Sequence, residues 1–425
     1  MTTTAPSSFT DESFDTFLDA RDEPVWLAEL RREAWAKFQE LNWPARNEEE
    51  WMRTDIRLFK LDRYQMPAGA RPAPRAPLKT GVELAGWVDE NGDSRLLDEY
   101  AAKGVVCCSL EDACRSHGDL VREHLFRQLP IGYDRFAALH AAFWANGAFI
   151  YVPRGVTVEL PLHVVASLAD GQAETGHLLV VLEDGAAATL LSEMHGDGGG
   201  LHCGGVELSI GRGANLRFVE LQEWGQETWQ FGHEYASLQA DASLQWTLAA
   251  MGTRLAKVNQ TVSLAGPGAT SQVNGVLFTE GRQHVAYHTL QHHEAPHCRS
   301  DFLYKSALQD KSRTVWRGMI KVDPVAQKTD GYQRNDNLLL SPDARADSIP
   351  GLEIEADDVR CTHGSTSGRV DEELLFYAQC RGFTRNEAVR MVVSGFFQQI
   401  FDRITIESVR DALGEAIARR VRNYE

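Results

Sequence analysis

The sequence predicts a mainly β protein in which a parallel β-helix lies between two helical regions. Residues 146 to about 360 consist of short β-rich runs separated by Gly and Asp turns, with little helical periodicity. Within them, the similar segments GAAATLL, GANLRF, DASLQW and GATSQV begin at Gly185, Gly213, Asp241 and Gly268, which are 28, 28 and 27 residues apart. A nearly constant period is typical of the stacked coils of a solenoid. Two alternatives stay open: Gly-Ala is a common pair that can recur by chance, and the histidine content suits a double-stranded β-barrel of the cupin type.

Length and charge exclude several classes of protein. The chain has 425 residues and a net charge of −17, from 43 Lys+Arg and 60 Asp+Glu, and we find no basic stripe along it. Phosphate repels so acidic a protein, so we expect no nucleic-acid partner. The longest apolar stretches are far shorter than the roughly 18 residues that span a bilayer, so we expect no membrane insertion. The N-terminal residues lack a secretory signal pattern, and the seven irregularly spaced cysteines fit a reducing compartment, so we expect a cytoplasmic protein.

The helical region before the β core is predicted to span residues 1–145. Residues 12–60 look helical, because Trp26, Leu30 and Phe38 recur at helical spacing. Residues 66–79 contain four prolines, which favour an extended linker, and a second helical pattern covers residues 134–144. The β core is predicted over residues 146–366.

The last 59 residues, 367–425, are predicted to return to helix. Gly382 suits the position just after a helix, and Thr384 with Glu387 forms a capping box before an apolar run. The predicted apolar face of the helix that follows consists of Ala388, Met391, Val392, Phe396 and Ile400, and that of the last helix consists of Ile406, Val409, Leu413 and Val421.

The common self-sufficient catalytic signatures are absent from the sequence. It contains no P-loop, no glycine-rich dinucleotide fingerprint, no G-x-S-x-G elbow and no H-E-x-x-H. We therefore expect no catalytic residues in this chain.

A histidine cluster is the first candidate metal site. Five histidines lie from His284 to His297, and Cys298 follows directly. Because side chains alternate along a strand, His284, His288 and His292 are expected to share one face. Imidazole and thiolate suit zinc, copper, iron or nickel. The alternative is that these histidines pack on the polar face of a sheet.

Cys361 and His363 form the second candidate site. They are two residues apart in the run LEIEADDVRCTHG, and a continuous strand would place both side chains on one face, as a shared metal or cluster requires. Glu355, Asp357 and Asp358 lie close by in the sequence. The alternative is a strand end that binds nothing.

The region around this second site resembles a known family. The runs AQKTDGYQRNDNLLLS, LEIEADDV, CTHG and LFY…RGF are similar to the C-terminal signature of the SufB/SufD family of iron–sulfur cluster assembly proteins. The segments HTLQHH, YKSAL and WRGMIKV match as well, and PARNEEEWMRTD resembles the N-terminal P-x-R-x-x-E-x-W motif of the family. The resemblance covers most of the chain and is weakest over about residues 60–145.

Within the family, the chain looks most like SufD. SufB-like chains read C-x-H-E-A where this chain reads Cys361-Thr362-His363-Gly364-Ser365, and they carry an N-terminal cysteine motif that is missing here. Ser365 replaces the usual alanine, which is a small change.

The resemblance implies a right-handed parallel β-helix and a non-catalytic scaffold role in the SUF system. It implies pairing with a SufB-like subunit, binding of SufC-like ATPases, and a transient iron–sulfur cluster shared with the partner near Cys361 and His363. We expect Met391, Phe396 and Val409 to contribute to ATPase docking. The sequence leaves open a homodimer of the isolated chain and a flavin (FAD) in the complex. It also leaves three alternatives, namely a SufB-type primary scaffold, a cupin-like metal enzyme using the histidine cluster, and a β-helix polysaccharide lyase.

Overall fold

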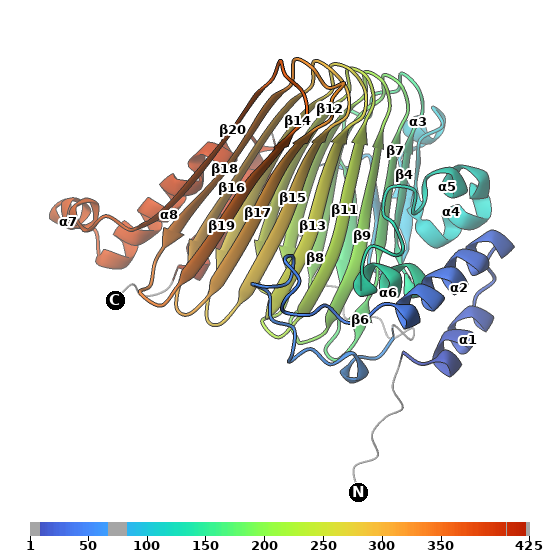
Figure 1. The fold of residues 1–425 in the computed structure, drawn as a ribbon, viewed down its shortest axis with the longest axis horizontal. Coiled ribbons are helices and arrows are strands. Elements are labelled where there is room, and N and C mark those ends of the chain that lie inside the picture. The colour runs from blue at the N-terminus through green and yellow to red at the C-terminus, as the bar shows by residue number, and fades with distance from the viewer. Residues whose placement is uncertain (1–8, 67–82, 405, 422–425) are drawn as a thin grey trace, which may run out of the picture.

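The protein is a long β-solenoid with helices at both ends (Figure 1). The computed structural model describes residues 9–66, 83–404 and 406–421. The predicted linker at 66–79 lies outside the described residues except for Met66. One sheet contains, in spatial order, β2 (Ser94–Leu96), β1 (Gly86–Val88), β5 (Leu162–Ser167), β8 (Ala187–His195), β10 (Asn215–Glu223), β12 (Ser243–Met251), β14 (Thr270–Thr279), β16 (Arg299–Leu308), β18 (Asp330–Leu339) and β20 (Arg360–Arg369).

The second sheet faces the first across the interior of the solenoid. It contains, in spatial order, β19 (Arg345–Ile354), β17 (Arg313–Val322), β15 (His284–His293), β13 (Leu255–Leu264), β11 (Trp229–Leu238), β9 (Leu201–Ile210), β7 (His177–Leu182), β4 (Gly147–Val152) and β3 (Val106–Ser109), and β6 (Ala173–Glu174) pairs with β9. From β7 to β20 the chain alternates between the sheets, and each strand pairs in parallel with its counterpart in the neighbouring coil. This arrangement confirms the solenoid. The cupin-type barrel is wrong, because the sheets end at separate edges instead of closing on themselves.

The repeat seen in the sequence corresponds to one turn of each coil. The residues two positions after the four repeat starts, namely Ala187, Asn215, Ser243 and Thr270, pair with one another in register. All four starts have positive φ, as do the equivalent residues of earlier and later coils, and the whole series is Gly155, Gly185, Gly213, Asp241, Gly268, His297 and Lys328. Glycine dominates the series because it has no Cβ to oppose left-handed backbone.

Backbone hydrogen bonds join these turns into a ladder. The Gly185 N–H donates to the carbonyl of Arg212 at 2.8 Å, and the Gly213 N–H donates to that of Ala240 at 2.8 Å. His297 and Lys328 continue the ladder through the carbonyls of Gln327 and Asp358. Each coil therefore fixes the turn geometry of the next one.

The N-terminal helices are α1 (Asp11–Asp19), α2 (Val25–Glu40), α3 (Asp98–Ala101), α4 (Leu110–Ser116), α5 (Gly118–His124) and α6 (Arg135–Phe143). α4 and α6 pack on the outer face of the second sheet, α5 packs on α4 and α2 on α6, whereas α3 places Tyr100 in the core between the sheets. An aromatic cluster joins them: Phe143 packs edge-on against Trp35 at 5.3 Å, and Phe136 stacks on Phe231 of β11 at 3.6 Å between ring centroids.

The predicted helix over residues 12–60 is wrong beyond Glu40. Residues 41–66 form turns and one short 3₁₀ helix, Leu61–Arg63, that cross the outer face of the second sheet. Pro44 disfavours further helix. The apolar residues of this segment serve tertiary contacts instead, because Trp51 and Phe59 pack against Phe136 and Phe231.

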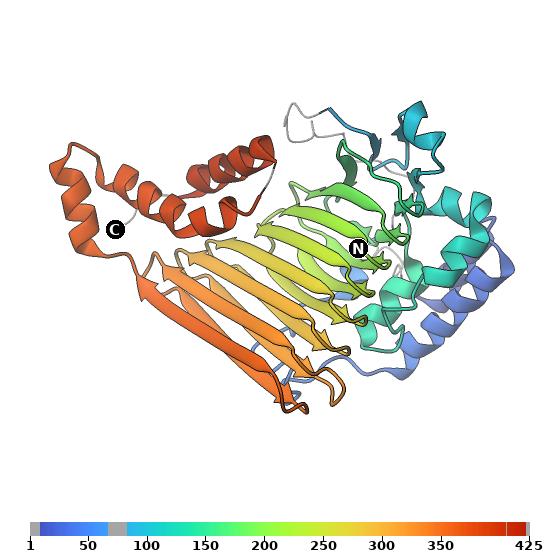
Figure 2. The same ribbon diagram turned by 90° about the horizontal axis from the view of Figure 1, so that it is seen from above.

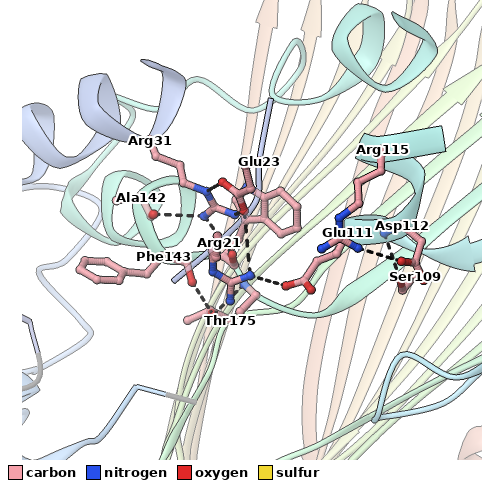
Figure 3. Close-up of polar contacts among 12 residues, drawn as sticks. Arg21, Glu23, Arg31, Ser109, Glu111, Asp112, Arg115, Ala142, Phe143 and Thr175 are labelled. Carbon is pink, nitrogen blue, oxygen red and sulfur yellow. Dashed lines mark hydrogen bonds and ion pairs between the residues drawn. The ribbon is translucent and has the colours of Figure 1, made fainter. Parts of the chain in front are cut away.

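A buried arginine fixes α2 to the start of the solenoid (Figure 3). The Arg31 guanidinium forms two bonds with the Glu23 carboxylate, at 2.7 and 2.8 Å, and donates to the carbonyls of Ala142 and Trp144 at 3.1 and 2.9 Å. Beside it, Arg21 binds Glu111 at 2.5 Å. These contacts provide hydrogen-bond partners for a fully buried guanidinium. Burial lowers the pKa of Arg31, and the Glu23 carboxylate opposes this shift.

The C-terminal helices cover part of the outer face of the first sheet (Figure 2). They are α7 (Glu372–Cys380), α8 (Arg385–Phe401) and α9 (Glu407–Arg420). Gly382 follows α7 with a φ of 96°, and Thr384 and Glu387 form the predicted capping box. The predicted apolar face of α8 needs correction. Its buried side chains are Ala388, Val389, Val393, Phe397, Ile400 and Phe401, whereas Met391 is exposed.

Two further observations complete the architecture. The first coil is flanked by antiparallel strands, with β2 against β1 and β3 against β4, while the last coil has no strand beyond it among the described residues. Of the helices that the structure describes, none is long and apolar enough to cross a membrane.

Candidate functional site

The last coil of the solenoid forms an open end. β19 and β20 are the final strands of their sheets, and no strand within the described ranges pairs with their outer edges. The inward-facing side chains of this coil are therefore uncovered, and Leu352 and Ile354 of β19 are 38% and 39% exposed. Unpaired backbone groups beside exposed apolar side chains are a template for another chain.

Cys361 and His363 lie in β20 on the inward face of this open end. They pair in register with Gly331 and Gln333 of β18, both of which are buried. The sequence-based expectation that both side chains share one strand face is confirmed. Two residues along a strand separate their Cα atoms by about 7 Å, so both groups can face one ligand approaching the open end.

The two side chains differ in exposure. Cys361 is half-buried against a small cluster that includes Ile320 and Val359, and Gly331 beneath it leaves room, because a Cβ there would lie 3.3 Å from the sulfur. Burial raises the pKa of the Cys361 thiol, so ligand binding must be coupled to loss of its proton. His363 is exposed.

The interior next to this site is polar. The Gln333 amide nitrogen donates to the carbonyls of Gly318 and Gly351, at 3.3 and 3.1 Å. Asn337 donates to Asn335 at 2.9 Å and to Ser367 of β20 at 3.2 Å. Hydrogen bonds of these amides, and not apolar side chains, therefore attach the last coil to the preceding one here.

Ion pairs at the edges of the sheets reinforce this attachment. Arg360 binds Asp330 at 2.5 Å, and Lys321 lies 3.7 Å from Glu353. Asp347 pairs with both Arg313 and Arg345. Each pair joins residues of the last coil to residues of the preceding one, apart from the local Arg345–Asp347 contact.

The histidine cluster is not assembled into a metal site. β15 carries His284, His288 and His292 on its outward face, as predicted, but they lie along the length of the strand and have separate surroundings. His284 Nε2 is 3.4 Å from Thr54 Oγ1 of the segment that crosses the sheet, and His292 binds Asp323 at 3.0 Å. Burial, with Lys257 and Arg317 nearby, lowers the pKa of His288 to about 2. Over the described ranges, no three His, Cys, Asp or Glu side chains are grouped to hold a metal ion.

The C-terminal helices present an apolar surface. Its residues are exposed by 42–69% and comprise Leu374, Phe376, Tyr377, Phe383 and Met391, which we call the C-terminal apolar patch. Phe396 is only partly exposed, with the Lys305 ammonium 4.9 Å from its ring centroid, and Val409 is 1% exposed. Of the three residues expected to dock a partner, Met391 alone belongs to the patch. The missed signal was the run LLFY, since a helix cannot bury four consecutive apolar residues on one face.

Comparison with protein families identifies the chain. Residues 164–396 match the model described as "SUF system FeS cluster assembly, SufBD core domain", and residues 86–164 match that of the SufBD N-terminal region. The core match spans the solenoid from β5 through the open end to most of α8.

Individual relatives agree with this match. An iron–sulfur cluster assembly SufBD family protein of Mycobacterium leprae is 33% identical over 294 residues, which cover 67% of this chain and 74% of the relative. SufD of Bacillus subtilis is 26% identical over 99% of this chain and 100% of its own length, and SufB of the same organism is 26% identical over 73% of this chain and 68% of its own. The chain therefore belongs to the SufBD family of iron–sulfur cluster assembly proteins.

Proposed function

We propose that this chain is a SufD-like, non-catalytic scaffold subunit that completes a cluster-building site together with a SufB-like partner. The observation that carries the proposal is the placement of Cys361 and His363 on the inward face of an uncapped solenoid end. The iron–sulfur cluster is the cargo of this site and is held only during assembly.

A partner is required because this chain alone offers too few ligands to hold a cluster. A cluster normally needs about four protein ligands, whereas this end offers one thiol and one imidazole on its inward face. The acidic residues Glu355, Asp357 and Asp358 lie in the adjoining turn, and all three are exposed. A second open solenoid end, pairing edge to edge with β19 and β20, would supply the missing ligands. In the absence of a SufB-like chain, the same edges suit a homodimer.

The ATPase role falls to a separate subunit. The chain has no P-loop, and the C-terminal apolar patch is an exposed surface on helices at the same end as the cluster site. We propose that a SufC-like ATPase docks there, with Met391, Phe376 and Tyr377 as anchors and Phe396 at the margin. Buried Val409 would act only by supporting α9.

Two features favour the SufD-like over the SufB-like assignment. The run Cys361-Thr362-His363-Gly364-Ser365 lacks the C-x-H-E-A pattern, and the alignment with a SufD extends over the full length of both chains. A SufB-type primary scaffold is the alternative that stands closest. Neither the family description nor the relatives' names mention a flavin, and flavin is not part of the proposal.

The test is cluster assembly by the complete complex. The chain, a SufB-like subunit and a SufC-like ATPase are co-expressed, and cluster formation is followed by visible absorbance after supply of iron and sulfide. His363→Ala should leave the composition of the complex unchanged and slow cluster formation at least tenfold. Thr362→Ala, next to it on the outward face, is the matched control. Wild-type cluster formation by the His363→Ala complex would make His363 structural and the proposed site wrong.

A further inference from the structure

A cavity lies inside the solenoid at the end remote from Cys361. It has a volume of about 50 Å³ and is bounded by the first coils of both sheets. The space exists because glycine stands at the same inward position in three successive coils, at Gly176, Gly204 and Gly232. In the next coil that position is taken by Val258.

The glycines also make room for side chains that fold over the backbone. A Cβ on Gly204 would lie 2.6 Å from the imidazole carbon Cε1 of His202, and one on Gly176 would overlap the carboxylate of Glu174. Glu174 and His202 bind each other. His177, which also lines the cavity, lies 3.1 Å from the carboxylate of Glu207. Both histidines therefore already have carboxylate partners.

Carboxyl groups are the charged side chains of the lining, beside apolar residues, glycines and the two histidines. It contains five carboxyl groups and neither lysine nor arginine; the five are Asp89, Glu90, Glu174, Glu220 and Glu234. Glu220 of β10 accepts from the Gln222 amide at 2.8 Å and lies 3.3 Å from the Trp246 indole nitrogen. Glu234 of β11 accepts from the Gln260 amide at 2.9 Å. All these donors are neutral, so Glu220 and Glu234 are buried together without a paired cationic side chain among the described residues.

An unpaired amide oxygen supplies the second observation. Gln230 is 1% exposed and lines the cavity, yet its Oε1 has no hydrogen-bond partner. Its orientation is fixed by a chain of bonds: the Gln222 amide nitrogen donates to Glu220, which leaves Gln222 Oε1 to accept from the Gln230 amide nitrogen at 2.8 Å. The free acceptor is thus the oxygen of Gln230.

We propose that this cavity binds one partly hydrated divalent cation of the oxygen-preferring class through Glu220, Glu234 and the Gln230 amide oxygen. Carboxylate and amide oxygens are the ligands such cations take, and Mg²⁺-like ions commonly keep several waters beside one or two carboxylates. At roughly 10–15 Å³ for each water, the cavity has room for about four. This donor set fits the absence of a grouped trio of His, Cys, Asp or Glu among the described residues.

The entrance suits a cation as well. The lining continues to Asn146, which is exposed, and to Asp89 and Glu90, which are partly exposed. Two carboxyl groups at the mouth raise the local concentration of cations and exclude anions. The site does not rest on the proposed function, because it lies several coils from the open end.

Manganese is the probe, because its EPR signal separates bound from free ion. The purified full chain, stripped with a chelator, should bind one Mn²⁺, and Mg²⁺ should displace it. Glu220→Gln/Glu234→Gln keeps the shape of both side chains and should weaken Mn²⁺ binding at least tenfold. Glu99→Gln, on exposed α3 at the same end, is the matched control and should bind Mn²⁺ as the wild type does.

Thermal unfolding shows whether the double variant is still folded. Mn²⁺ should raise the thermal unfolding midpoint of the wild type and of Glu99→Gln, but not that of the double variant, which should still unfold cooperatively. Wild-type chain that takes up no Mn²⁺ at millimolar concentration overturns the proposal. A folded double variant that binds Mn²⁺ as tightly as the wild type would also overturn the proposal, because the ion would then be held elsewhere.

Discussion

The ammonium of Lys257 lies 5.5 Å from the centroid of the Trp51 ring, enclosed between β13 and the segment that crosses the second sheet. It donates a hydrogen bond to Asn259 Oδ1 at 2.5 Å. Burial lowers the pKa of Lys257 from 10.5 to about 7, despite the nearby carboxylates of Glu50 and Asp134. Burying this charge therefore costs stability.

Lys257→Met should stabilise the protein most at low pH. Below pH 7 both folded and unfolded states hold the proton, and the folded state carries the full cost. Between pH 7 and 10.5 only the unfolded state holds it, so the free energy of unfolding of the wild type rises with pH. At about 1.4 kcal/mol for each pKa unit, less the lost Asn259 bond, the variant should gain about 2–4 kcal/mol at pH 6.

Urea unfolding at pH 6 and pH 9.5 measures this difference. The advantage of Lys257→Met should be largest at pH 6 and smaller at pH 9.5, and the exposed Lys103→Met should show neither effect. Equal gains at both pH values would mean that Lys257 is not the group that titrates.

Loss of the C-terminal apolar patch should abolish ATPase docking without unfolding the chain. Phe376→Glu places a charge on an exposed side chain, so the thermal midpoint should stay within about 2 °C. Binding of a SufC-like ATPase, measured by calorimetry, should weaken at least tenfold, because exposed aromatic anchors dominate such interfaces. Val25→Glu, equally exposed but on α2 at the other end, serves as control. Undiminished binding by Phe376→Glu would place the ATPase elsewhere.

A charge at the open end should prevent pairing of solenoid ends. Leu352 of β19 faces inward and is 38% exposed, so Leu352→Lys can reach solvent in the single chain but would bury an unpaired ammonium in a joined pair. Co-purification with a SufB-like subunit should fall at least tenfold. Val325→Lys, on an exposed turn, should leave pairing intact. Normal pairing of the Leu352 variant would show that this edge is not the interface.

The Arg31–Glu23 pair should behave as a buried ion pair. Glu23→Gln leaves the Arg31 charge buried without its carboxylate and should cost about 3–5 kcal/mol. Arg31→Met combined with Glu23→Gln should recover part of that loss, since no charge is then buried. Urea unfolding of Glu23→Gln, of Arg31→Met and of the double variant gives the coupling energy, and additive effects would mean that the two side chains act independently.

The solenoid was predictable because its turns leave a mark in the sequence. Gly185, Gly213 and Gly268 recur because left-handed backbone favours glycine, and the period follows from the coil length. His297 and Lys328 adopt the same backbone without glycine, so the repeat fades from the sequence in the later coils.

The inner and outer faces of the strands were much less predictable. In β10, Leu216 and Phe218 face inward while Val219 and Leu221 are also buried, beneath the C-terminal helices. Because both faces of such a strand carry apolar residues, the sequence does not show which alternate positions point into the solenoid. Glu220 could therefore not be assigned to the interior from the sequence. α8 is likewise apolar on most sides, so the buried face predicted from the sequence differs from the one that the structure shows.

Cys361 and His363 were predicted as a pair because they stand two residues apart in a run that resembles the family signature, and β20 places both side chains on its inward face. Residues 41–66 could not be assigned, because their aromatic spacing imitates a helix while their partners, Phe136 and Phe231, lie far along the chain.

The two ends of the solenoid are chemically unequal, and this limits how far the protein can polymerise. Antiparallel β2 and β3 terminate the stack on one side, while β19 and β20 leave the other side reactive. On one side the terminal strands β2 and β3 are short, with three and four residues, whereas β19 and β20 on the other side have ten residues each. A two-fold pairing through β19 and β20 would use up both of these long edges, so a third molecule could not join there and the assembly would close as a pair instead of growing into a fibre.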